Sequence, residues 1–179
     1  LTIYKGLKMK YLVFSDSHGN TGAMRKIIKL NLEAGKLDGV FFLGDGIRDV
    51  IKLTHEFPSL HFDCVLGNCD APSDVRDELT DTTYEKMVTV GAWKFLLMHG
   101  HKYDVKYTYQ EAVDHAIEKG ADCLFFGHTH RMEDAQLDGS LKGSVRIINP
   151  GSCGTGFHKS FALIETVGGQ LVCGFGEIK

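Results

Sequence analysis

Five short segments of this sequence carry side chains of the types that bind metal ions, and each follows a run of apolar residues or a short loop. The candidate ligands in these segments are Asp16, His18, Asp45, Asn68, His99, His128 and His130. Seven oxygen and imidazole donors are too many for one tetrahedral ion, but they suit two divalent ions that share a bridging carboxylate. Paired ions of this kind serve phosphoryl transfer, so the pattern predicts phosphate-ester chemistry.

The charge balance of this cluster favours the same chemistry. Asp16 and Asp45 supply about two negative charges, so two divalent ions would leave roughly +2, or about +1 with a bridging hydroxide. A cluster that stays positive attracts phosphate oxygens and stabilises the charge that develops on them. Asp45 is the candidate bridging ligand, because Gly44 and Gly46 on either side let backbone and metal approach closely. We therefore expect a hydroxide shared by the two ions to attack phosphorus in line.

The spacing within two segments predicts how their ligands are shared. Asp16 and His18 alternate along a segment that we expect to be extended, so their side chains should point to the same side and hold one ion together. His128 and His130 have the same spacing. We expect this second pair to give one imidazole to each ion.

The elements that must position these side chains follow from the periodicity of apolar residues. Short β-branched, aromatic and aliphatic runs predict strands over 10–15, 40–43, 62–66, 86–90, 93–98, 123–126, 132–137, 144–148, 160–166 and 170–175. Helical spacing predicts helices over about 21–34, 48–56 and 109–118, with Asn20 or Thr21 as the first cap. Alternation of strands and helices, followed by hairpins, predicts two sheets packed face to face with helices outside. Each ligand segment falls at the carboxyl end of a predicted strand, where such sheets gather their sites.

Composition and charge limit the classes of function. The chain has 179 residues, 43% of them hydrophobic, and a formal net charge of −3. It has no run of basic residues, so we expect no nucleic-acid polymer as a partner. No apolar run approaches the ~20 residues that span a bilayer, so we expect no membrane association. The five cysteines lack a paired spacing, which predicts a cytoplasmic protein in which Cys64 and Cys123 are buried as small hydrophobes.

The first residues differ from the rest of the chain. Residues 1–8 precede Met9, which opens the first predicted strand. We expect residues 1–8 to be an N-terminal leader or a start-site artefact, and residues 9–179 to form one domain.

Taken in order, Asp-x-His, Gly-Asp, Gly-Asn-x-Asp, a His before Gly and Gly-His-x-His resemble the motifs of the calcineurin-like metallophosphoesterase superfamily, and most closely its small single-domain prokaryotic phosphodiesterase branch. The resemblance runs from Met9 to about Phe175. It implies an α/β fold, namely a four-layer α/β/β/α sandwich of two mixed sheets with outer helices. It also implies two bound divalent ions, for which manganese is expected ahead of iron, zinc or nickel. It further implies a homodimer. Carried over by motif, one ion would be held by Asp16, His18, Asp45 and His130, and the other by Asp45, Asn68, His99 and His128.

One position departs from the commonest pattern of this family. Many members have Gly-Asn-His-Asp, in which the His protonates the leaving group or contacts a phosphate oxygen, whereas the third residue here is Cys69. A thiol beside cations becomes a thiolate, which is a poor proton donor, so we expect diesters and aryl phosphates to react better than alkyl monoesters. Cys69 is a candidate catalytic residue, and His101 is a candidate substitute donor or a rim residue. Asp70 is expected to orient the ligands from a second shell, and His158 is a further candidate for lining the site.

These observations leave several functions to separate. The first is a metal-dependent phosphodiesterase acting on a small phosphodiester substrate. The alternative from another class is a non-catalytic interaction scaffold with the same fold, as in the small subunit of the eukaryotic retromer coat. Such scaffolds lose ligands, notably the His of Asp-x-His, and His18 is present here. A nuclease is disfavoured because no basic groove is expected, while a nucleotidase or dinucleoside-polyphosphate hydrolase fits the same chemistry.

Overall fold

The computed structural model describes residues 8–178. The predicted leader, residues 1–8, lies outside the described residues except for Lys8, whose side-chain nitrogen lies 3.0 Å from a carboxylate oxygen of Glu165. Within the described range no helix is both long enough and apolar enough to cross a membrane.

The strands form two five-stranded mixed sheets. The first has the order β10-β9-β1-β2-β3, and its strands are β1 (Met9–Phe14), β2 (Gly39–Phe42), β3 (His61–Cys64), β9 (Lys159–Val167) and β10 (Gln170–Ile178). The second has the order β4-β5-β6-β8-β7, and its strands are β4 (Glu85–Val90), β5 (Trp93–Met98), β6 (Cys123–Phe125), β7 (Met132–Asp138) and β8 (Ser144–Pro150). In each sheet three strands run parallel, β1-β2-β3 and β5-β6-β8, and the others pair antiparallel. The carboxyl ends of both parallel sets can therefore contribute to one site.

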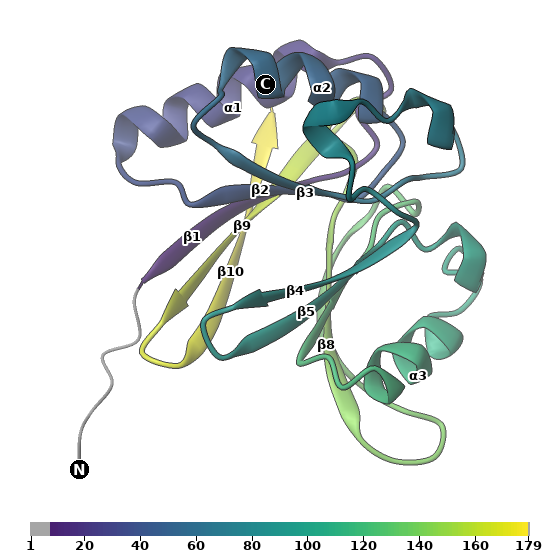
Figure 1. Ribbon diagram of the computed structural model, residues 1–179. Helices are drawn as coiled ribbons and strands as arrows, with labels where there is room; N and C mark the ends of the chain where they lie inside the picture. The colour runs from purple at the N-terminus through teal and green to yellow at the C-terminus, as the bar shows by residue number, and fades with distance from the viewer. Residues whose placement is uncertain (1–7, 179) are drawn as a thin grey trace.

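Three α-helices in the described range cover the outer faces of the sheets. They are α1 (Thr21–Ala34), α2 (Ile47–Glu56) and α3 (Gln110–Glu118). Figure 1 shows α1 and α2 above the first sheet and α3 on the far side of the second. The Asn20 side chain accepts a hydrogen bond from the N–H of Ala23 at 3.3 Å and so caps α1, as predicted. The short 3-10 turns η1 (Pro72–Asp74), η2 (Asp77–Leu79) and η3 (His101–Tyr103) were not predicted.

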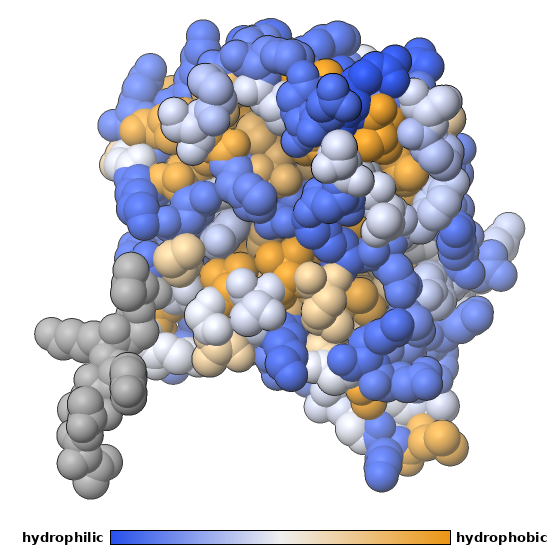
Figure 2. Space-filling view, viewed as in Figure 1, coloured by the Kyte–Doolittle hydropathy of each residue, from blue (hydrophilic) through white to orange (hydrophobic). Residues whose placement is uncertain are grey.

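Hydrophobic side chains fill the three spaces between these four layers. Between the sheets, the ring centroids of Phe41 lie 6.1 Å from Phe95 and 5.8 Å from Phe125. A second core packs α1 and α2 against the first sheet, and a third packs α3 against the second. Figure 2 shows a mainly hydrophilic surface over α1 and α2 and hydrophobic atoms between the two sheets. The predicted four-layer α/β/β/α sandwich of two mixed sheets is confirmed.

Most strand boundaries differ from the prediction by one or more residues, and two of these differences bear on the site. The third strand ends at Cys64 rather than at residue 66, because Val65 turns to form an isolated bridge with Thr83. The segment from Asn149 to Pro150 belongs to the end of β8, where Pro150 pairs with Met132. This places Asn149 at a strand end beside the ligand segments.

Candidate metal centre

The candidate ligands follow the carboxyl ends of parallel strands in both sheets. Asp16 and Asp45 come two and three residues after β1 and β2, His99 follows β5 directly, and His128 comes three residues after β6. Asn68 lies in the turn after β3. Because the two sheets pack face to face, these strand ends open onto a common edge of the sandwich.

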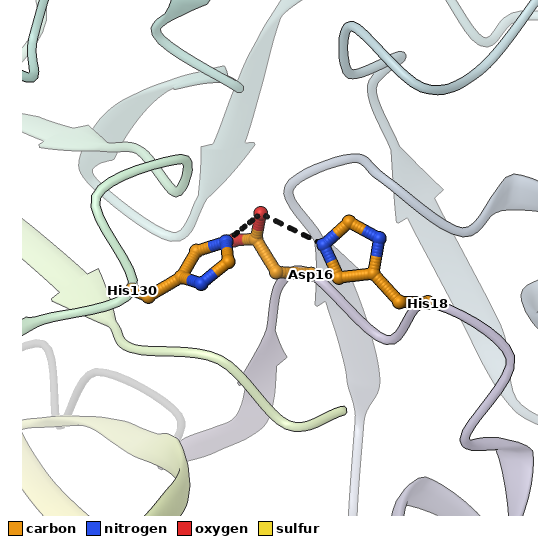
Figure 3. Close-up of side chains that lie close together, drawn as sticks. All are labelled: Asp16, His18 and His130. Carbon is orange, nitrogen blue, oxygen red and sulfur yellow. Dashed lines mark hydrogen bonds and ion pairs between the residues drawn. The ribbon is translucent and has the colours of Figure 1, made fainter. Parts of the chain in front are cut away.

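One cluster, here termed the Asp16 group, consists of Asp16, His18 and His130. Figure 3 shows the two imidazoles on either side of the Asp16 carboxylate. The Oδ1 atom of Asp16 lies 3.1 Å from Nε2 of His130 and 3.8 Å from Nε2 of His18. Its other oxygen, Oδ2, accepts hydrogen bonds from the hydroxyl of Ser15 at 2.6 Å and from the N–H of His128 at 3.1 Å. Asp16 is fully buried, so this pair of donors fixes Oδ1 toward the histidines.

A second cluster, the Asp45 group, consists of Asp45, His99 and His128. The Nε2 atom of His99 lies 3.4 Å from Oδ2 of Asp45, 3.1 Å from Nδ1 of His128 and 3.2 Å from Oδ1 of Asn68. The His99 ring is completely buried, and its Nδ1 lies 2.7 Å from the carbonyl oxygen of Leu43. An N–H at Nδ1 donating to that carbonyl directs Nε2 into the cluster.

The two groups adjoin one another. The Oδ1 atom of Asp16 lies 3.9 Å from Nε2 of His99 of the Asp45 group, and Asp45 lies between imidazoles of both groups. Its Oδ2 atom lies 3.4 Å from His99 of its own group and 4.0 Å from Nε2 of His18 of the other group. Its Oδ1 atom accepts a hydrogen bond from the N–H of Cys69 at 2.8 Å. Asp45 thus presents one oxygen to residues of both groups, which is the placement that a bridging carboxylate needs.

The surroundings shift the pKa values of Asp45, His128 and His99 in different directions. Burial acts to raise the pKa of Asp45, but hydrogen bonding and charge from His99, together with the N–H of Cys69, bring the net pKa below its ordinary value. Burial and the neighbouring charges of His99 and Lys106 lower the pKa of His128 to about 4. For His99 burial opposes protonation, but the carboxylates of Asp45 and Asp16 outweigh it and raise the pKa.

The donor set fits divalent cations. Two buried carboxylates, an amide oxygen and four imidazoles converge, and acceptor atoms face one another at 3.1–4.0 Å. Acceptor atoms at such short distances repel one another unless a proton or a cation lies between them. A neutral imidazole such as His128 near pH 7 is the form that binds metal. Mixed carboxylate and imidazole ligands suit Mn²⁺, Fe²⁺, Ni²⁺ and Zn²⁺.

The backbone at these ligands is unusual. Six described residues other than glycine have positive φ, and five of them are Asp16 (56°), His18 (44°), Asp45 (60°), His128 (65°) and His130 (59°). The left-handed conformation costs an L-residue roughly 1–2 kcal/mol, and such strain gathers at functional sites. The expectation that Asp16 and His18 lie on an extended segment is wrong, since both turn through this conformation. The two side chains meet nevertheless, because each left-handed residue redirects the chain.

Asp70 organises the loop that carries Asp45. Its Oδ2 atom accepts from the N–H groups of Asp45 at 2.7 Å and Gly67 at 2.9 Å, and its Oδ1 from those of Gly46 at 2.8 Å and Ile47 at 2.9 Å. Gly67 and the Asp45 side chain lie so close together that a Cβ added to Gly67 would be 2.0 Å from Oδ1 of Asp45. Asp70 therefore contacts the backbone of the ligand loop rather than the donor atoms.

Three supporting residues were missed by the sequence analysis. The amide of Asn149 donates to the carbonyl of Gly127 at 2.9 Å and to the hydroxyl of Thr129 at 3.0 Å, and so holds the loop between the two ligand histidines. Asp49 accepts from the hydroxyl of Ser17 at 2.7 Å and from the N–H of Gly19 at 2.8 Å. The third is Ser15, which fixes Asp16. The sequence features that could have pointed to two of them were the acidic Asp49 in the first turn of α2 and the hydroxyl of Ser15 directly before Asp16.

The remaining candidates lie at the edge of the cluster. The Cys69 thiol lies near His18 and Asp45, and its pKa is raised to about 11 by burial and by Asp45. The ring centroid of His101 lies 5.4 Å from that of His99 and 6.2 Å from that of His128. Its role as a proton donor stays a prediction, as does that of Cys69. His158 is exposed and belongs to none of the candidate metal-binding groups among the described residues.

Comparison with known proteins identifies the family of the chain. The family model of the calcineurin-like phosphoesterase superfamily domain matches residues 9–169. A probable metallophosphoesterase of Bacillus subtilis strain 168, YsnB, is 34% identical over 145 residues, which are 80% of this chain and 75% of that protein.

Solved structures resemble the chain over nearly its whole length. A predicted phosphoesterase from Streptococcus pneumoniae TIGR4 has a TM-score of 0.72 and 24% identity, covering 96% of this chain and 90% of the other. An archaeal phosphodiesterase has a TM-score of 0.68 and 23% identity, covering 94% and 100%. A mutant of Vps29 from Entamoeba histolytica has a TM-score of 0.67 and 22% identity, covering 96% and 100%. At these identities the structures show a shared fold, while the family match and YsnB show the family. The chain belongs to the calcineurin-like phosphoesterase superfamily.

Proposed function

We propose that this protein is a metal-dependent phosphodiesterase that hydrolyses small phosphodiesters. The observation that carries the proposal is the convergence of all seven candidate donors, with the Asp16 group and the Asp45 group joined through carboxylate oxygens of Asp45 and Asp16. One ion would be held by Asp16, His18, Asp45 and His130, and the other by Asp45, Asn68, His99 and His128. Divalent ions in such a site polarise phosphoryl oxygens and lower the pKa of bound water.

The chain's own residues contribute position and charge. Ser15 and the N–H of His128 fix the Asp16 carboxylate, and Asp70 fixes the loop of Asp45. Among the described residues only Asp16 and Asp45 give carboxylates to the cluster, so two divalent ions there would keep a positive charge that favours a phosphate group. We propose manganese as the native metal, because mixed carboxylate and imidazole ligands accept it and occupancy follows availability.

The leaving group receives little help from the protein in this proposal. A general acid works best when its pKa lies near the working pH. With a pKa of about 11, the Cys69 thiol holds its proton too tightly to act as a general acid near neutral pH. In the other state, a thiolate beside cations, it would have no proton to give. We therefore propose that the enzyme prefers esters whose leaving group departs without protonation.

The likeness to Vps29 is the main support for the scaffold alternative. It extends over 96% of this chain, but at 22% identity it reflects the fold alone. A scaffold has no need of seven converging donors or of five ligands held in left-handed backbone. These two features favour an enzyme.

Turnover of chromogenic esters tests the proposed function. Metal-free protein should hydrolyse bis-p-nitrophenyl phosphate only after Mn²⁺ is added, and should hydrolyse p-nitrophenyl phosphate more slowly. The alkyl monoester glycerol 2-phosphate should react slowest, by about 10²–10⁴-fold, because that factor is typical of a missing general acid. Absence of turnover with Mn²⁺, Fe²⁺, Zn²⁺ and Ni²⁺ would favour the scaffold instead.

A further inference from the structure

A cleft of about 480 Å³ opens beside the candidate metal centre. It is lined by His18, Asp45 and Cys69 of the centre and by Arg48 and Lys52 of α2. This volume is within the range of about 300–1,000 Å³ that is usual for small-molecule sites. A substrate whose phosphorus lies at the centre can therefore extend along α2.

The carboxylates that line this cleft are already engaged by donors of the protein. Both oxygens of Asp70 are bonded to backbone N–H groups. Asp49 is 4% exposed, and it accepts from Ser17, Gly19, Thr21 and, at 3.2 Å, from Nζ of Lys52. Asp74 is likewise buried, accepting from the N–H of Ala71 at 3.1 Å and from Arg48. The negative charge of these carboxylates is therefore hydrogen-bonded, and it is buried at Asp49 and Asp74.

The positive charge of the same lining faces solvent. The side chains of Arg48 and Lys52 are 75% and 61% exposed, although each pairs with one buried carboxylate, Arg48 with Asp74 and Lys52 with Asp49. They are four residues apart on α2, so they share one face of the helix, where two like charges repel each other. Arg48 directs both Nε, at 2.9 Å, and Nη2, at 2.5 Å, to a single oxygen of Asp74. In the described part of the chain its Nη1 has no hydrogen-bond partner, so one edge of the guanidinium remains available.

We infer that Arg48 and Lys52 bind a second phosphate group of the substrate, remote from the reacting phosphorus. The preferred substrate is then a phosphodiester that also carries a phosphate monoester. This inference rests on the proposed function and narrows its substrate class. Arg48 supplies planar paired donors that match phosphate oxygens, and Lys52 adds a point charge on the same helix face.

Arg48 also ties η1 to α2 through Asp74, and a test must separate that role from ligand binding. Asp74→Asn breaks the ion pair but keeps the guanidinium, whereas Arg48→Gln removes both. Arg25→Gln is the matched control, because it makes the same charge change and breaks the Arg25–Glu56 pair, which does not line the cleft. Lys52→Gln tests the second cation.

Two probes differ only in the remote phosphate: thymidine 5′-(p-nitrophenyl phosphate) with and without a 3′-phosphate. For the wild type we expect a KM about tenfold lower for the 3′-phosphorylated probe, the effect of one charge-assisted hydrogen bond. Arg48→Gln should raise the KM for the 3′-phosphorylated probe about tenfold and leave its kcat unchanged. The kinetics of the probe without the 3′-phosphate should stay the same. Lys52→Gln should act in the same direction, while Asp74→Asn and Arg25→Gln should keep the preference.

Equilibrium binding of thymidine 3′,5′-bisphosphate and thymidine 5′-monophosphate gives a readout that is independent of turnover. Equal affinities in the wild type, or an unchanged preference in Arg48→Gln, would overturn the inference. Loss of the preference in Asp74→Asn as well would assign Arg48 a structural role, which also overturns it. Arg48-dependent binding of the bisphosphate without turnover of either probe would support the anion site while the proposed function fails.

Discussion

Replacing Asp45 by Asn should lower turnover of bis-p-nitrophenyl phosphate by more than about 100-fold, beyond the ~10–100-fold loss typical of an outer-shell partner. A single oxygen of Asp45 lies within 4.0 Å of imidazoles of both groups, as does Oδ1 of Asp16. Asn has nearly the same shape, and its oxygen can still accept from the N–H of Cys69. The change therefore removes the charge while the loop keeps its conformation. The loss should appear in kcat/KM, together with the loss of at least one bound metal ion per chain.

Asp114→Asn is a suitable control for this variant, because Asp114 is a surface residue on α3 that bonds Ser140. The control should keep full activity and full metal content. Full activity in Asp45→Asn would exclude Asp45 as the shared ligand.

Replacing Asp70 by Asn should damage stability as well as activity. Asp70 accepts from four backbone N–H groups, and an amide offers one acceptor oxygen and a donating NH₂ in its place. Each buried donor left without a partner costs roughly 1–3 kcal/mol. Because the Asp70 side chain is only partly buried, the free energy of unfolding should fall by about 2–3 kcal/mol. Urea unfolding of the metal-free protein measures this loss directly.

The same change should weaken metal binding about 10–100-fold, because it loosens the backbone that positions Asp45. Asp77→Asn, at an exposed position of η2, is the matched control and should leave both quantities unaltered. The two variants therefore differ: Asp45→Asn loses function with stability preserved, and Asp70→Asn loses both. An Asp70→Asn protein as stable as the wild type would show that these four hydrogen bonds contribute little.

Much of the fold was predictable because local patterns and tertiary packing agree. The apolar runs that predicted strands contain Phe41, Phe95 and Phe125, which meet between the sheets. The Asn20 cap was readable because its hydrogen bond spans only three residues. The burial of Cys64 and Cys123 followed from the apolar segments around them.

The convergence of the candidate ligands was predictable to the level of strand ends, but their conformations were not. Asp16 and His18 have left-handed backbone, and the residues that follow them, Ser17 and Gly19, are hydrogen-bonded by Asp49 from 30 or more residues away. Asn149 acts on the His128–His130 loop across 20 residues or more. Such contacts have no local periodicity, so a single sequence does not reveal them. The cleft along α2 was missed for another reason. The basic side chains there resemble an ordinary solvated helix face.

Metal content is the most direct test of the account. Purified protein is stripped with a chelator, reloaded with Mn²⁺, freed of excess ion and analysed by inductively coupled plasma mass spectrometry, alongside Asp45→Asn. The account predicts close to two ions per chain in the wild type and one or none in the variant, with anomalous diffraction locating the ions between the Asp16 group and the Asp45 group. Only trace metal in the wild type, or ions bound away from these residues, would contradict it.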